Sequence, residues 1–165
     1  ASQALDRMET LIGDVLSLAR QSEDVEDTQP VSLSAIVDDC WASIDGQEAT
    51  IEVVDDCTFQ ADKARTKQVF ENLFRNAIEH GGSDVTIHVG ALTDRDGFYV
   101  ENDGPKIPAE DREKIFETGF STGDEGLGLG LAIVSGAVSA HGWEITATEG
   151  ELRGASFEIS NVIIE

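Results

Sequence analysis

Basic residues are scarce in this sequence of 165 residues, in which 11 lysines and arginines stand against 33 aspartates and glutamates. With a formal net charge of −22, the chain cannot bind nucleic acid through a general phosphate-neutralising surface, so we expect no nucleic-acid partner. No apolar run approaches the roughly 20 residues of a membrane helix, and no secretory signal is present. We therefore expect a cytoplasmic domain, and a transmembrane or sensor region ahead of residue 1 stays compatible with it.

Cysteine is also rare. Cys40 and Cys57 stand alone without CxxC spacing, so no zinc site is indicated. We interpret them as two small core or surface residues of a protein in a reducing compartment.

The acidic residues are spread along the whole chain and do not form a tail, while lysine occurs at four positions, 63, 67, 106 and 114. This pattern resembles that of proteins from salt-loving microbes whose cytoplasm has a high salt concentration, and we expect a halophilic archaeon as the source. The alternative is an ordinary acidic protein. In dilute buffer such a chain should repel itself, because the Debye length grows from about 8 Å near physiological salt to about 30 Å.

The chain is long enough for one domain with a short appendage. In residues 1–21 the apolar side chains step by three and four positions, as in a coiled-coil seam, at Leu5, Met8, Ile12, Val15 and Ala19. Two heptads are marginal as an isolated helix, so we expect this helix to pack either on its own domain or in an intermolecular bundle. Residues 22–31 are acidic, poor in apolar side chains and carry Pro30 near their end, which indicates a linker.

Residues 32–165 mix helices and strands in an order that predicts one α/β domain. Helices are expected at residues 34–43, 62–81, 110–114 and 127–141, with Ser34 and Asp62 as N-caps and Gly81 and Gly142 as terminating residues. Strands are expected at residues 49–54, 57–60, 85–89, 98–101, 143–148 and 155–160. The elements do not alternate as βαβ units, and residues 98–101 return antiparallel to 85–89. We therefore predict a mixed, mainly antiparallel sheet packed on helices.

The helix that ends at Gly81 has two chemically opposite faces. At about 100° per residue, one face is apolar and carries Phe70, Leu73, Phe74 and Ala77. The opposite face carries Asn72, Arg75, Asn76 and Glu79. An amide oxygen is a neutral hard ligand suited to Mg²⁺, so Asn76 is a candidate ligand, and Asn72, about 5–6 Å away, can orient a water or a phosphate. Two asparagines at this spacing are weak evidence alone, since solvent exposure explains most such pairs.

Three glycines at spacing two, Gly126, Gly128 and Gly130, lead into the last helix. Glycine lets the backbone approach a ligand closely and directs free N–H groups and the positive helix end at a phosphate. A dinucleotide-binding turn would share this spacing, but no clear strand precedes it and no βαβ unit follows. Residues 116–126, also rich in glycine, form a candidate mobile lid.

Four segments in order resemble the nucleotide-binding boxes of the sensor histidine kinase catalytic domain, a branch of the GHKL superfamily. They are NLFRNAIEH (72–80), VENDGPKIP (100–108), IFETGFST (115–122) and GLGLGLAIV (126–134). The resemblance implies a two-layer Bergerat-type α/β sandwich that holds Mg·ATP between the asparagine helix and a lid. Residues 1–21 resemble the second helix of the dimerisation hairpin in such kinases, which implies a homodimer through this helix in the full protein.

By this resemblance Asn76 ligates Mg²⁺ and Asn72 lies near the phosphates, and both count as catalytic. ATP-hydrolysing relatives carry a glutamate in place of Asn72, and because an amide cannot act as a general base, Asn72 fits a kinase that protects ATP from water. The other implied ATP-binding residues are Arg75, Glu79, His80, Asn102, Asp103, Gly104, Ile107, Phe120, Thr122, Gly126, Leu127, Gly128, Leu129, Gly130 and Leu131. For His80, a satisfied histidine at a helix end is an equally good interpretation.

The sequence departs from the family pattern at three positions. Asn102 replaces the aspartate that accepts a hydrogen bond from the adenine amino group, and Asp103 falls one residue later; a neutral bond in place of a charged one costs roughly 1 kcal/mol. Lys106 replaces a glycine, which makes its loop less permissive, and Glu79 stands where many relatives carry a basic phosphate contact. Arg75 can compensate from the edge of the same face. We expect ATP binding that is weakened and not abolished.

The phosphoacceptor histidine of such kinases lies on an upstream helix that this sequence does not contain. The three histidines, His80, His88 and His141, lie in contexts that favour structural roles. We therefore expect a chain that binds ATP and does not phosphorylate itself. Its partners would be a phosphoacceptor helix, from its own missing segment or a second subunit, and a response regulator whose aspartate receives the phosphoryl group. The alternative is a degenerate nucleotide-sensing or protein-interaction module of the same fold.

Overall fold

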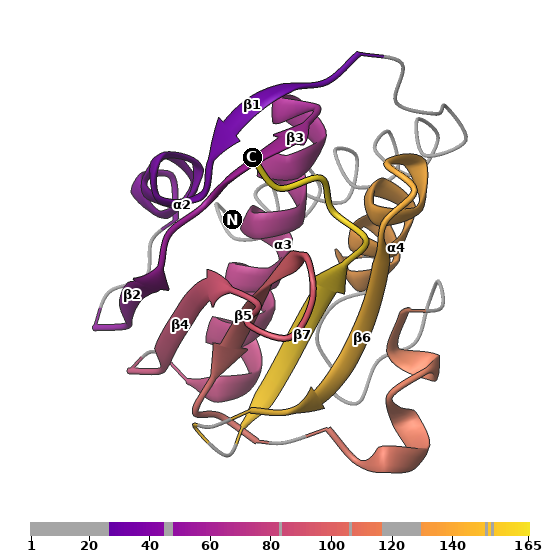
Figure 1. Cartoon of the computed structure of the whole chain (residues 1–165). Helices are drawn as coiled ribbons and strands as arrows, with labels where there is room; N and C mark the ends of the chain where they lie inside the picture. The colour runs from indigo at the N-terminus through magenta and orange to yellow at the C-terminus, as the bar shows by residue number, and fades with distance from the viewer. Residues whose placement is uncertain are drawn as a thin grey trace, which may run out of the picture.

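The computed structural model describes residues 27–44, 48–82, 84–105, 107–116, 130–150, 152 and 154–165 (Figure 1). Its helices are α2 (Leu33–Ala42), α3 (Lys63–Gly81) and α4 (Gly130–Ala140), with 3-10 turns η1 (Ala109–Asp111) and η2 (Lys114–Phe116). Its strands are β1 (Gln29–Ser32), β2 (Thr50–Asp55), β3 (Thr58–Ala61), β4 (Thr86–Ala91), β5 (Gly97–Asn102), β6 (Glu144–Glu149) and β7 (Ala155–Ser160). The helix predicted for residues 1–21 lies outside the described residues.

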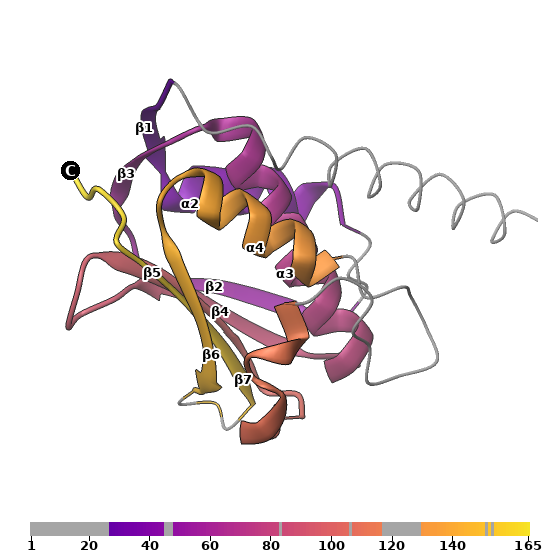
Figure 2. The ribbon, with the colours of Figure 1, turned by 90° about the vertical axis from the view of Figure 1, so that its right-hand side faces the viewer.

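Five strands form the main sheet in the order β2-β4-β5-β7-β6. β2 runs parallel to β4, and the other three neighbouring pairs are antiparallel. The predicted mixed, mainly antiparallel sheet is therefore confirmed. The helices α2, α3 and α4 cover one face of this sheet, which gives two layers (Figure 2).

The core lies between α3 and the centre of the sheet. The predicted apolar stripe of α3 is confirmed, because each of its four side chains is at most 2% exposed: Phe70, Leu73, Phe74 and Ala77. The ring of Phe70 lies 5.3 Å from that of Phe98 on β5. Side chains alternate along a strand, so Phe98, Val100 and Asn102 all face the helix layer. The end of β5 thus carries an amide to the underside of α3.

The cap of α2 differs from the prediction of Ser34. Ser32 caps the helix, its Oγ accepting a hydrogen bond from the N–H of Ala35 at 3.3 Å. Ser34 lies in the first turn, where its N–H and Oγ donate to the two carboxylate oxygens of Asp56 at 3.0 and 2.8 Å. Asp56 comes from the β2–β3 connection, so this partner cannot be read from the local sequence.

Both long helices end as predicted where the structure describes their ends. Asp62 caps α3, its Oδ1 accepting from the N–H of Arg65 at 3.1 Å, and Gly81 is the last helical residue. Gly82 follows with a φ of 98°, a left-handed conformation that favours glycine. After α4, which ends at Ala140, Gly142 has a φ of 77° and so also takes a left-handed conformation.

Two predictions of short elements need correction. The helix expected at residues 110–114 is instead the pair of 3-10 turns η1 and η2, because the Asp111 N–H bonds back three residues to the Pro108 carbonyl at 2.9 Å. No strand was expected at Gln29–Ser32, yet β1 pairs antiparallel with β3. β1 begins inside the range predicted as a linker, and its partner lies some 30 residues further along the chain. Among the described residues, no helix is both long and apolar enough to cross a membrane.

Candidate nucleotide-binding site

The amide of Asn72 lies where the middle of α3 meets the start of α4. Its side chain is 7% exposed, and its Nδ2 donates to the carbonyl of Gln68 one turn earlier at 2.7 Å. This bond turns Oδ1 outward, where Arg75 Nη2 approaches to 3.5 Å. A Cβ added to Gly130, the first residue of α4, would come within 3.3 Å of the same oxygen. Glycine at this position therefore lets the start of α4 pack directly against Asn72.

One turn further along α3, Asn76 is half-buried and has no hydrogen-bond partner among the described residues. Its amide oxygen is consequently available to a ligand. The described residues contain no group of three or more histidine, cysteine, aspartate or glutamate side chains that could hold a metal ion. A divalent cation beside Asn76 would therefore take most of its ligands from phosphate oxygens and water, as Mg²⁺ commonly does.

The turn after β5 holds two neighbouring polar side chains in different environments. Asn102 is 6% exposed, and its Oδ1 accepts a hydrogen bond from the N–H of Gly104 at 2.9 Å. Asp103 is exposed, and its Oδ1 accepts from the N–H of Thr86 at 2.9 Å, while its own N–H donates to the Thr86 carbonyl at 3.2 Å. Asn102 thus lies beneath α3, and the Asp103 carboxylate is bound to the start of β4.

Two close glycine contacts hold this turn in place. A Cβ on Gly104 would lie 2.7 Å from the Cα of Gly81 at the end of α3. A Cβ on Gly154 would lie 2.1 Å from the Asn102 carbonyl oxygen and 2.7 Å from that of Gly104. Sequence reasoning assigned Gly81 only a helix-ending role and did not find Gly154. A glycine just before a strand was the available signal, because such glycines often mark close backbone approach.

A polar strip runs along α3 between these contacts, and we call it the track. It carries Asn72 and Asn76, and it extends from Gly130 at the start of α4 to Gly81 and the Asn102 turn, residues 102–104 at the end of β5. At about 1.5 Å per helical residue, Gly81 and the Asn102 turn lie roughly 14 Å along the helix from Asn72 and Gly130. The positive end of the α4 dipole is at Gly130, and the negative end of the α3 dipole is at Gly81. An elongated ligand with an anionic end would therefore place its anion beside Asn72 and its neutral end beside Asn102. The amide and glycine donor set of this track fits a magnesium-bound nucleoside triphosphate.

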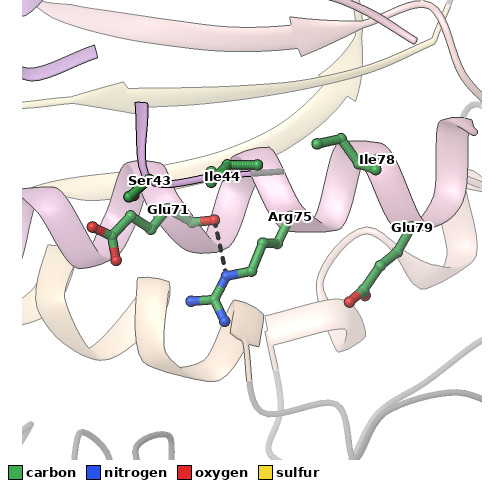
Figure 3. Close-up of a pocket in the computed structure, with 6 residues that line it drawn as sticks. All are labelled: Ser43, Ile44, Glu71, Arg75, Ile78 and Glu79. Carbon is green, nitrogen blue, oxygen red and sulfur yellow. Dashed lines mark hydrogen bonds between the residues drawn. The ribbon is translucent and has the colours of Figure 1, made fainter. Parts of the chain in front are cut away.

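Arg75 and Glu79, two of the predicted ligands, line a hollow of about 570 Å³ on the flank of α3, shown in Figure 3. Ser43 and Ile44, just after α2, form part of its wall. The Nε of Arg75 donates to the Glu71 carbonyl at 3.4 Å. Arg75 and Glu79 thus line this hollow from the same polar face of α3 that carries Asn72 and Asn76.

The remaining predicted residues divide into three groups. His80 is exposed and has no partner among the described residues. Ile107 and Leu131 pack partly buried against the core. The others lie outside the described residues: Phe120, Thr122, Gly126, Leu127, Gly128 and Leu129.

His141 connects the two helices of the track at their far ends. The N–H of Asp62, the cap of α3, donates to its Nε2 at 2.9 Å, and its Nδ1 lies 2.8 Å from the carbonyl of Ala137 in α4. Its ring stacks on Trp143 with centroids 3.9 Å apart. Burial lowers the pKa of His141, which keeps the ring neutral with Nδ1 as donor and Nε2 as acceptor. The structural role predicted for this histidine is confirmed.

Comparison with known proteins adds independent evidence. Residues 61–162 match the family described as histidine kinase-, DNA gyrase B-, and HSP90-like ATPase. The sensor histidine kinase ZraS of Klebsiella oxytoca is 33% identical over 161 residues, which cover 92% of this chain and 35% of the relative. The chain thus spans about a third of the length of that protein.

Two solved structures resemble the chain closely. Full-length ShkA in complex with AMPPNP has a TM-score of 0.78 and 26% identity, and the match covers 99% of this chain and 37% of that chain. Histidine kinase ThkA in complex with the response regulator protein TrrA has a TM-score of 0.72 and 28% identity, with 99% and 48% covered.

Proposed function

The chain belongs to the histidine kinase-, DNA gyrase B- and HSP90-like ATPase family as the ATP-binding catalytic domain of a two-component sensor histidine kinase, and we propose that it presents Mg·ATP for phosphoryl transfer to a histidine on an upstream helix. The phosphoryl group then passes to an aspartate of a response regulator. Support for the nucleotide comes from the ShkA complex with AMPPNP, an ATP analogue. Support for the regulator comes from the ThkA complex with TrrA.

In this proposal the phosphates lie beside Asn72 and the start of α4, which pack against each other, and the base lies at the turn after β5 that holds Asn102. Asn76 is the protein ligand of Mg²⁺, which when bound supplies charge neutralisation at the transferring phosphoryl group. Asn72 offers Oδ1 as an acceptor that can orient a water beside the phosphates, because its Nδ2 is already bonded to the Gln68 carbonyl. It cannot deprotonate that water, because an amide has no basic lone pair at neutral pH. The chain thus positions ATP and protects it from hydrolysis until the acceptor arrives. The packing of Asn72 Oδ1 against Gly130 at the α4 N-terminus carries this assignment.

A nucleotide titration tests it. The chain is titrated with AMPPNP in molar KCl, with and without Mg²⁺, and compared with Asn76→Ala and with Asn76→Asp, which keeps an oxygen ligand. We expect the Mg²⁺-dependent gain in affinity to be lost in Asn76→Ala and retained in Asn76→Asp. Asn161→Gly is the matched control, because it removes an amide at a distant residue whose φ of 64° suits glycine. Equal Mg²⁺ dependence in all four proteins would contradict the role of Asn76.

The missing acceptor gives a second test. Incubated alone with γ-labelled ATP, the chain should acquire no label, whereas a chain bearing the upstream helix should acquire label that is stable to base and labile to acid. Such label on the isolated chain would show that it contains an acceptor of its own. In the full protein the acceptor comes from the same subunit or from a second one, in a homodimer built through residues 1–21. We also propose that the full protein is attached to a membrane.

A degenerate nucleotide-sensing or interaction module is the second candidate. It is favoured by Asn102, Lys106 and Glu79, which depart from the family pattern. The same titration separates the two, since a folded chain that binds no nucleotide at all would favour the interaction module.

A further inference from the structure

The orientation of the Asn102 amide follows from hydrogen-bond chemistry. The atom that faces the Gly104 N–H at 2.9 Å must be Oδ1, because a backbone N–H can only donate and the Nδ2 group has no acceptor capacity. The other end of the amide is therefore Nδ2, with two donor hydrogens.

The Nδ2 group has no hydrogen-bond partner among the described residues. In that same part of the chain, every side-chain nitrogen or oxygen that is sealed from solvent has a partner. Nδ2 is therefore not sealed, although the residue as a whole is only 6% exposed. Nδ2 is thus a donor that a ligand can satisfy.

A carboxylate at the same position would behave differently. It could accept from Gly104 with one oxygen and offer the second oxygen as an acceptor, whereas an amide offers a donor in that place. Asp103 cannot restore the acceptor, because its carboxylate is bound to the Thr86 N–H and the side chain is exposed. The buried polar group at this end of the track is thus inverted from acceptor to donor.

The substituent at the 6-position of a purine determines whether the base pairs with a donor or with an acceptor at this place. Adenine carries an amino group there, which is a donor and faces Nδ2 unfavourably, while a 6-oxo purine carries an acceptor. We propose that the base site of this chain selects 6-oxo purine nucleoside triphosphates, such as inosine or guanosine triphosphate, at least as well as ATP, with Asn102 as the residue that decides. This inference rests on the proposed function, which puts the base at the Asn102 turn.

The test compares dissociation constants for ATP, ITP and GTP, measured by calorimetry with Mg²⁺ in molar KCl. ITP differs from ATP at the 6-position and in the protonation of the adjacent ring nitrogen, and GTP adds a 2-amino group. The chain is compared with Asn102→Asp and with the control Asn161→Asp, which makes the same amide-to-carboxylate change far from α3. Asn161 otherwise donates from Nδ2 to the Gly142 carbonyl at 2.8 Å.

We expect the unchanged chain to bind ITP at least as tightly as ATP. Asn102→Asp should shift the ITP-to-ATP ratio towards ATP by at least about tenfold, since one hydrogen bond is gained and another lost. Asn161→Asp should keep the ratio within about twofold.

Two results would overturn the inference, and they are distinguishable. If the unchanged chain prefers ATP by more than about tenfold and Asn102→Asp keeps that preference, adenine reaches the second lone pair of Oδ1 and the inversion has no effect. If no variant binds any of the three nucleotides while circular dichroism shows each to be folded, the proposed function falls and this inference falls with it.

Discussion

Asn102 and Asp103 are adjacent and nearly isosteric, yet their side chains serve different partners. The first bonds to Gly104 beneath α3, and the second bonds to Thr86 at the start of β4. The same contrast separates Asn72, whose amide is engaged with Gln68 and Arg75, from Asn76, whose amide has no partner among the described residues. At the residue scale, the proposed site depends on which hydrogen-bond donors and acceptors already have a partner within the protein and which are left for a ligand.

Gly154 offers a test of the backbone contact behind the turn. Its Cβ would meet two backbone oxygens that cannot move independently, so Gly154→Ala should lower the free energy of unfolding by about 1–3 kcal/mol or more in urea denaturation. Gly142→Ala is the control: it has a φ of 77° but nothing within 4 Å of its Cβ, so it should cost about 1–2 kcal/mol from backbone strain alone. Equal losses for the two variants, or a smaller one for Gly154→Ala, would contradict the contact.

His141 gives a pH-dependent prediction. Because burial lowers its pKa, the unfolded chain binds a proton at about pH 6.5 while the folded chain does not, and stability falls as the pH drops below that value. His141→Gln should lose about 1–3 kcal/mol at neutral pH and should show a shallower dependence of unfolding free energy on pH below about 6.5. Urea titrations across this range measure both. His80→Gln, which alters an exposed histidine at the other end of α3, is the matched control. An unchanged or steeper slope in His141→Gln would refute the assignment.

At the element scale, α3 is fixed at both ends by segments distant in sequence. His141 bonds to the N–H of its cap residue Asp62, and Gly104 packs against Gly81 at its last turn. The polar strip between these ends therefore keeps its position relative to α4 and β5. This attachment allows the polar face of α3 to act as a binding track.

The start of α2 is fixed in a comparable way by Asp56. Burial alone would raise the pKa of Asp56, but hydrogen bonds from Ser34 and from the Cys57 N–H outweigh it and hold the pKa below its usual value. The stabilisation is therefore present above about pH 4 and is lost as the pH falls through the lowered pKa. Asp56→Asn should cost about 0.5–2 kcal/mol at pH 7, as loss of a helix cap does, and the difference from the unchanged chain should close below about pH 4.

Equilibrium denaturation at pH 7 and at a pH well below 4 measures this effect. Asp55→Asn is the matched control, since the neighbouring carboxylate is exposed and has no hydrogen bond among the described residues. A penalty for Asp56→Asn that stays constant down to the lowest pH would mean that the carboxylate charge does not contribute.

At the scale of the whole molecule, the net charge of −22 opposes the compact state. Screening shortens the Debye length from about 10 Å at 0.1 M salt to about 3 Å at 1 M. We expect the urea midpoint to rise steadily from 0.1 M to 2 M KCl and the affinity for Mg·AMPPNP, which is also anionic, to rise with it. Sucrose at matched water activity, which cannot screen charge, is the control. Stability and affinity that do not respond to KCl would disprove the expected dependence on concentrated salt.

Much of the fold could be predicted because its signals are local. The apolar stripe of α3, its Asp62 cap and the strand at residues 155–160 follow from periodicity and turn chemistry within one segment. β1 was missed because four residues that include a proline form a strand only when β3 is beside them. The α2 cap was misplaced by two residues because Asp56, which holds Ser34, lies 22 residues away.

The sequence by itself determined the family resemblance, the acidic character and the identity of the residues that offer amide oxygens, since these depend on side-chain chemistry and spacing alone. Tertiary structure decided which of those groups remain available. It bound Asp103 to Thr86, turned the oxygen of Asn102 towards Gly104 and packed Gly130 against Asn72. Hydrogen bonds and close packing are satisfied between segments that only folding brings together, so no reading of one segment can reveal them.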